Sequence, residues 1–173
     1  MSIRRVLHKG LEINIPLSKS FDEEIELFSQ GALPSDHVFK LGSPSEVLKR
    51  AGFPVDKIIE LKGSILKTKE GRHLFSASEL KGLVEELAHP IAVFSYWGNR
   101  GRNVIVDVSK GEKKYLIGVQ FVDRENKPLE VSSIRTVFPK DSGEWLHWFE
   151  QGKGLYVDKK TPAVNNPTAN QSR

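Results

Sequence analysis

The sequence predicts an α+β fold: N-terminal helices followed by a four- to five-stranded antiparallel sheet, with a Trp-rich helix before the last strand. Ser20, Ser43, Ser76 and Asp141 are each followed three residues later by Glu, a pairing that satisfies the free amides of a helix start. Between residues 91 and 138, apolar runs of strand length alternate with turns rich in Gly, Asn and Pro. Helices followed by closely spaced strands are typical of a helical layer on a sheet.

The four capped starts predict four short helices. Gly52 and Pro54 should end the second helix, and Pro90 should end the third. The large aromatic residues of the fourth helix recur at helical spacing, which favours a role in the core. The expected helices cover residues 22–29, residues 44–51, the stripe Leu80, Leu83, Val84 and Leu87, and the segment after Asp141 with Trp145, Trp148 and Phe149.

The strands are expected to form a meander. Near Ser132 and Ser133 the apolar phase shifts by one residue, which predicts a β-bulge at a place where bulges often redirect side chains beside a site. The expected strands are an edge hairpin of residues 56–61 and 64–67, the meander 91–97, 103–108, 114–123 and 129–138, and a last strand at Tyr156 and Val157.

Length and composition set the broad class. The 173 residues suffice for one domain with its own core, and the absence of Cys excludes disulfides, thiolate zinc sites and cysteine nucleophiles. A formal net charge of +4 slightly favours an anionic partner. The apolar start is interrupted at His8, so neither a signal peptide nor a membrane contact is expected, and we predict a cytoplasmic protein. The expected organisation is an N-terminal extension (1–35), one main folded domain (36–160) and a flexible tail (161–173).

Several short motifs occur in a characteristic order: LGSPSEVLKRAG, RHLFSASEL, HPIAVF, SSIRTVFPK and GLYVDKK. In this order and spacing, residues 39–160 resemble phage MuF-type C-terminal toxin domains, grouped with the phage branch of the barnase–EndoU–colicin–RelE-like nucleases. The resemblance implies a metal-independent ribonuclease toxin that binds RNA on the exposed face of its sheet. It also implies roles for His73, Ser133 and Lys140, which match the family pattern.

Metal-free RNA cleavage needs a base, an acid and donors that hold the charged phosphate. His73 is the best candidate for proton transfer, because the pKa of histidine lies near neutrality. The remaining roles are assigned by side-chain chemistry: Arg135 and Lys140 hold phosphate oxygens, Ser133 and Thr136 donate to the scissile phosphate, Tyr156 stacks a base or donates a proton, and Arg72, Arg100 and Arg102 contact the nucleic-acid backbone.

No cofactor or metal is expected, since the chain has no His-x-x-x-His motif or carboxylate ladder. RNA is the expected partner, and the toxin resemblance adds an acidic immunity protein as a candidate. Two alternatives stay open. The same sheet could serve as a non-catalytic RNA-binding or phage structural interaction module, or the chain could be an ADP-ribosyl or nucleotidyl transferase toxin with Glu144 or Glu150 as its catalytic carboxylate.

Overall fold

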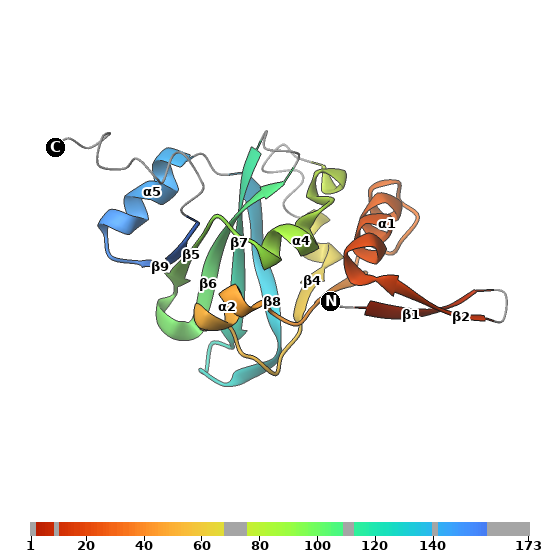
Figure 1. Cartoon of the computed structure of the whole chain (residues 1–173), viewed down its shortest axis with the longest axis horizontal. Helices are drawn as coiled ribbons and strands as arrows, with labels where there is room; N and C mark the ends of the chain where they lie inside the picture. The colour runs from red at the N-terminus through yellow and green to blue at the C-terminus, as the bar shows by residue number, and fades with distance from the viewer. Residues whose placement is uncertain (1–2, 9–10, 68–75, 109–112, 140–141, 159–173) are drawn as a thin grey trace.

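A computed structural model gives the fold and describes residues 3–8, 11–67, 76–108, 113–139 and 142–158 (Figure 1). A two-stranded hairpin, β1 (Ile3–His8) with β2 (Leu11–Pro16), projects from the end of the molecule where α1 (Leu17–Ser29) lies. The remaining elements are β3 (Val38–Gly42), α2 (Glu46–Arg50), β4 (Ile59–Lys62), the 3₁₀ turn η1 (Ala77–Leu80), α4 (Leu83–Ala88), β5 (Ala92–Tyr96), the 3₁₀ turn η2 (Gly98–Arg100), β6 (Gly101–Val108), β7 (Lys113–Val122), β8 (Pro128–Pro139), α5 (Ser142–Glu150) and β9 (Gly154–Val157).

The main sheet has seven strands in the order β3-β4-β8-β7-β6-β5-β9. The α+β class, the N-terminal helices and the Trp-containing helix before the last strand are confirmed. The expected strand number was too low, and the sheet is not wholly antiparallel, because β4 runs parallel to β8 with Ile59 opposite Ser132. That pairing joins segments far apart in the chain, so no local turn sequence could announce it.

Three local predictions were also wrong. Ser20 was expected to cap the first helix, but α1 begins at Leu17 and contains Ser20. Residues 64–67 were expected to form a strand, but residues 63–67 are helical and Leu66 is buried. Neighbouring apolar residues fit either conformation, so periodicity could not decide there. The cap of α2 is Ser45, whose Oγ accepts a hydrogen bond from the Leu48 amide at 3.3 Å, and not Ser43.

The sheet has two unlike faces, shown from one side in Figure 1 with α2 and α4 in front. The covered face packs against α1, α2 and α4 and forms the larger core, to which α1 contributes Phe21, Ile25 and Phe28. The opposite face, here called the open face, is covered in part by α5, whose Trp145 lies against Phe94 at a centroid distance of 6.2 Å. No helix in the described part of the chain is both long and apolar enough to cross a membrane.

The contact between α5 and the open face predicts a stability effect. Trp145→Ala should lower the free energy of unfolding by about 3–5 kcal/mol, because the Trp145 side chain is fully buried and its loss leaves a cavity. Leu27→Ala on the outer side of α1 is the control and should change it by less than about 0.5 kcal/mol, since Leu27 is 43% exposed. Urea unfolding of both variants measures the difference, and equal losses would contradict the packing of α5.

Candidate functional site

Beyond the part under α5, the open face is polar. Residues paired across neighbouring strands share a face, so the register shows which side chains stand together. One row crosses six strands through Tyr96, Gly101, Gln120, Ser133, Glu60 and Lys40. A second, shorter row consists of Asn103, Gly118 and Thr136.

Two glycines form the floor of these rows. A Cβ placed on Gly118 would lie 2.9 Å from the Cβ of Thr136 and 3.2 Å from the Oδ1 of Asn103, so both side chains close over the strand there. A Cβ on Gly101 would lie 3.0 Å from the Tyr96 ring. Both glycines are buried, because neighbouring groups fill the space that a side chain would take. The missing side chains therefore let the Asn103 amide, the Thr136 hydroxyl and the Tyr96 ring pack closely over the strands.

Strand β8 is irregular on both sides of Ser133, which confirms the predicted bulge. Its register against β7 shifts between Gly118 and Val119, which leaves Arg135 without a counterpart between Ile134 and Thr136. A second shift follows Gln120. Arg135 is exposed, whereas Ser133 is only 8% exposed. The bulge thus keeps Ser133 on the open face and releases the Arg135 side chain to solvent.

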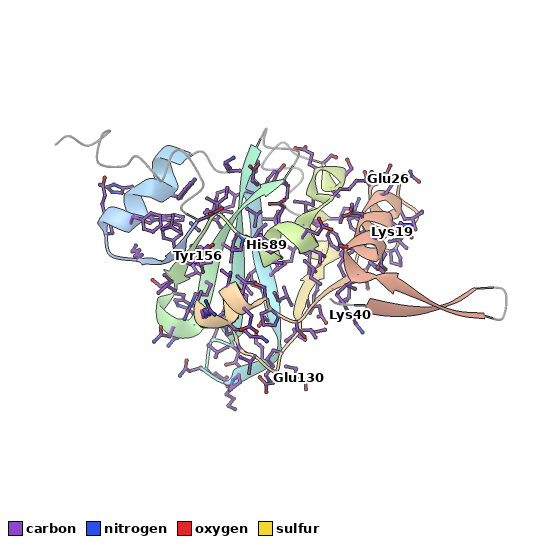
Figure 2. All side chains as sticks on the ribbon, viewed as in Figure 1. Lys19, Glu26, Lys40, His89, Glu130 and Tyr156 are labelled. Carbon is purple, nitrogen blue, oxygen red and sulfur yellow. The ribbon has the colours of Figure 1, made fainter. Side chains whose placement is uncertain are left out.

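The sequence-predicted residues do not form one cluster. Ser133 and Thr136 share the open face, but Pro139 lies six positions after Ser133 in β8, about 20 Å along the strand. Tyr156 pairs with Val93 and packs against the core of the covered face. Figure 2 shows Tyr156 toward the β9 edge, away from Lys40 on β3. His73, Arg72 and Lys140 lie outside the described residues.

Ser76 and Pro139 are the described residues that come next to the segments of His73 and Lys140 in the chain, and both lie at one end of the sheet. The Ser76 amide donates to Glu79 Oε2 at 2.8 Å, and the Tyr115 hydroxyl donates to Glu79 Oε1 at 2.8 Å. Tyr115 is paired with Pro139, the last residue of β8. Burial, together with the bond to Glu79, raises the pKa of Tyr115 far above its ordinary value, so the phenol remains a donor at all ordinary pH values.

Arg102, predicted to contact nucleic acid, is 7% exposed and lies on the covered face. Its Nε donates to the Ala51 carbonyl at 2.6 Å and its Nη1 donates to the Gly101 carbonyl at 2.7 Å. The guanidinium also lies 5.5 Å from the centre of the Phe121 ring, and burial lowers its pKa. Arg102 therefore ties α2 to β6. Arg102 stands two residues before the buried Val104 in β6, so both side chains lie on the same face. This spacing was the sequence signal that Arg102 faces the core.

Arg100 differs from Arg102 although only two residues separate them. It belongs to the η2 turn, and its guanidinium carbon lies 4.8 Å from the centre of the Trp97 ring. Trp97 is 44% exposed. Arg100 is therefore half-buried in an exposed turn, whereas Arg102 is buried. A nucleic-acid contact of Arg100 stays a prediction.

Three histidines whose side chains are described lie elsewhere. His37 pairs with Glu24 at 2.7 Å, His147 pairs with Glu150 at 3.3 Å, and His89 ends α4. His89 also borders a pocket of about 530 Å³ on the covered side, lined mainly by apolar residues such as Leu17, Leu48 and Leu87. The pocket contains none of the predicted site residues. Within the described ranges, no group of three His, Asp or Glu residues is placed to hold a metal ion.

The two neighbouring arginines predict opposite mutant behaviour. Arg102→Ala should lower the free energy of unfolding by at least about 2 kcal/mol, because two buried carbonyls each lose a donor at a cost of about 1–3 kcal/mol. Arg100→Ala should cost less than about 1 kcal/mol, the worth of an exposed cation–π contact. Thermal melts of both variants decide, and a stable Arg102→Ala would refute the tether.

Comparisons with known proteins were made for the whole chain. Comparisons with curated proteins and with solved structures found no match. A family model described as the phage MuF-C-terminal domain matches residues 64–162, which include β5 to β9 and most of the open face. This match covers more than half of the 173 residues. The chain therefore belongs to the phage MuF C-terminal domain family.

Proposed function

We propose that the chain is a metal-independent endoribonuclease toxin, with RNA bound on the open face of the sheet. The observation that carries the proposal is the polar part of that face, which α5 leaves uncovered and which includes Asn103, Gln120 and Thr136. Membership of the barnase–EndoU–colicin–RelE-like superfamily is part of the same proposal. An acidic immunity protein as partner and the cytoplasm as the place of action are also part of this proposal.

Single-stranded RNA suits this surface better than a duplex. Unpaired bases can lie flat on a sheet and offer their edges and 2′-hydroxyls to amide and hydroxyl groups. The long row from Tyr96 to Lys40 spans five inter-strand spacings, about 24 Å, which is enough for a strand and more than a mononucleotide needs. Gln120 and Ser133 stand at its centre.

Cleavage is proposed at the end of the sheet where β8 finishes. A base removes the 2′-hydroxyl proton, O2′ attacks the adjacent phosphorus, the P–O5′ bond breaks, and an acid protonates the leaving O5′. His73 is the proposed proton-transfer residue, with Lys140 and Arg135 holding phosphate oxygens and Thr136 donating to them. Support comes from Ser76 and Pro139, which flank these segments at the same end of the sheet.

The geometry divides the other predicted residues between tasks. Ser133 lies about 20 Å along β8 from Pro139, so we assign Ser133 to RNA binding and not to the scissile phosphate. Tyr156 and Arg102 face the covered side, and the proposed mechanism does not use them.

His73→Ala tests the catalytic part of this proposal. The wild-type protein should cleave single-stranded RNA in the presence of EDTA and leave 2′,3′-cyclic phosphate and 5′-hydroxyl ends. His73→Ala should lower the rate by about a hundredfold to ten-thousandfold, the usual loss of a general acid or base. Gel analysis and end-group mapping of the RNA measure both.

His147→Ala is the matched control, because His147 is a histidine on the surface of α5 with 62% of its side chain exposed. It should leave the cleavage rate unchanged, and neither variant should shift the melting temperature. A fully active His73→Ala protein would remove His73 from the mechanism. Activity that EDTA abolishes and magnesium restores would remove the metal-independent chemistry.

Asn103→Asp tests the binding face by itself. The change adds one negative charge without changing shape, and a charge about 4 Å from a phosphate costs about 1 kcal/mol in water. RNA affinity should therefore fall roughly fivefold, with a smaller loss at high salt. Asn126→Asp, the same change in the exposed turn between β7 and β8, is the control and should bind as wild type. Equal affinities for all three proteins would place RNA elsewhere.

A non-catalytic RNA-binding module is the second candidate. It is favoured by the positions of His37, His89 and His147, none of which belongs to the polar rows of the open face in the described part of the chain. This candidate keeps the effect of Asn103→Asp but predicts intact RNA and normal growth when the protein is expressed. Growth arrest with intact RNA would point to the transferase alternative, for which Glu150 lies exposed beside His147.

A further inference from the structure

We propose that the turn of Trp97 and Arg100 is a stacking site for an unpaired RNA base at the β5 end of the open face. The inference rests on the proposed function only in taking single-stranded RNA as the ligand. It does not depend on cleavage.

Trp97 is held in an unusual position. Its φ of 55° and ψ of 46° lie in the left-handed region, which a bulky residue seldom adopts, and 44% of the residue is exposed. Among the exposed large hydrophobic residues in the described ranges, Trp97 is the single aromatic one. Such a conformation persists where the surroundings impose it, and these positions gather at functional sites.

The indole is already paired with a cation. The guanidinium carbon of Arg100 lies 4.8 Å from the Trp97 ring centre, which orients the ring and sets a positive charge beside it. An aromatic ring next to a guanidinium matches both parts of a nucleotide, since the base stacks on the ring and the phosphate pairs with the cation.

The stacking site continues the long row of the open face. Tyr96 precedes Trp97 directly, and the Tyr96 ring lies over Gly101, the residue that follows Arg100. The exposed Lys153 borders the same strand, because its carbonyl accepts a hydrogen bond from the Ser95 amide at 3.0 Å. Trp97 thus follows the last residue of the long row, and the proposed RNA strand over Gln120 and Gly101 would continue onto its ring.

The surroundings favour a nucleic acid over a protein partner. Protein-docking patches are contiguous apolar areas. Trp97 is instead followed by Gly98 and Asn99, both exposed and neither with an apolar side chain, and then by a cation. A single ring among polar groups is suited to hold one base.

The test is a binding titration of the full chain with a single-stranded 2′-O-methyl oligonucleotide, which lacks the attacking hydroxyl and stays intact. RNA should quench tryptophan fluorescence through Trp97, since Trp145 is fully buried and Trp148 half-buried. Trp97→Phe should lose this quenching and keep most of the affinity, because phenylalanine still stacks. Trp97→Ala should weaken binding by about 5- to 150-fold, the worth of one stacked base.

Leu155→Ala is the matched control, with a similar exposure of 47% on the neighbouring edge strand, and it should bind as wild type. Wild-type affinity in Trp97→Ala would overturn the inference, and so would equal quenching by a duplex of the same sequence, whose bases cannot stack on a side chain. If the protein cleaves RNA but substitutions of Trp97 leave RNA binding unchanged, this inference alone is overturned. Binding that depends on Trp97 without cleavage would overturn the catalytic proposal alone.

Discussion

The structure depends on one strand, β8, and on its two different pairings. Along one edge β8 pairs antiparallel with β7, and along the other it pairs parallel with β4. As far as the chain is described, the parallel pairing of β4 with β8 is the one strand pairing that joins β3 and β4 to the other five strands of the main sheet. The Ser132 amide strengthens this contact by donating to the Ile58 carbonyl at 2.8 Å. Without β8, strands β3 and β4 would lose their pairing with the rest of the main sheet.

The sequence could predict what is local. Turn residues and apolar alternation located β5 to β8 within about two residues, and the shift in phase at Ser132 and Ser133 announced the bulge. It could not predict the place of β4, because parallel strands are joined by contacts remote in the chain. The prediction of a strand at residues 64–67 was wrong for another reason. Two adjacent apolar residues fit the periodicity of a helix as well as that of a strand.

The site was predictable to a lesser degree. Ser133 and Thr136 were recognised as residues of one sheet face, but the rise of the strand places Ser133 about 20 Å from Pro139 at the end of the sheet. Arg100 and Arg102 looked alike in the sequence. Arg100 lies in the η2 turn near the surface, whereas the register of β6 directs Arg102 into the core. Trp97 was overlooked, since its exposure is set by a left-handed backbone that no pattern of residue types reveals.

The tether made by Arg102 has a further consequence. One of its hydrogen bonds ends on Ala51 at the end of α2, and the other ends on Gly101, the residue that closes the η2 turn. Gly52 leaves room for this link, because a side chain there would collide with the guanidinium. Any change that displaces the Arg102 guanidinium therefore removes a hydrogen bond from the end of α2 and another from the residue that closes the turn. The helix on one face and the turn at the edge of the sheet thus depend on the same side chain.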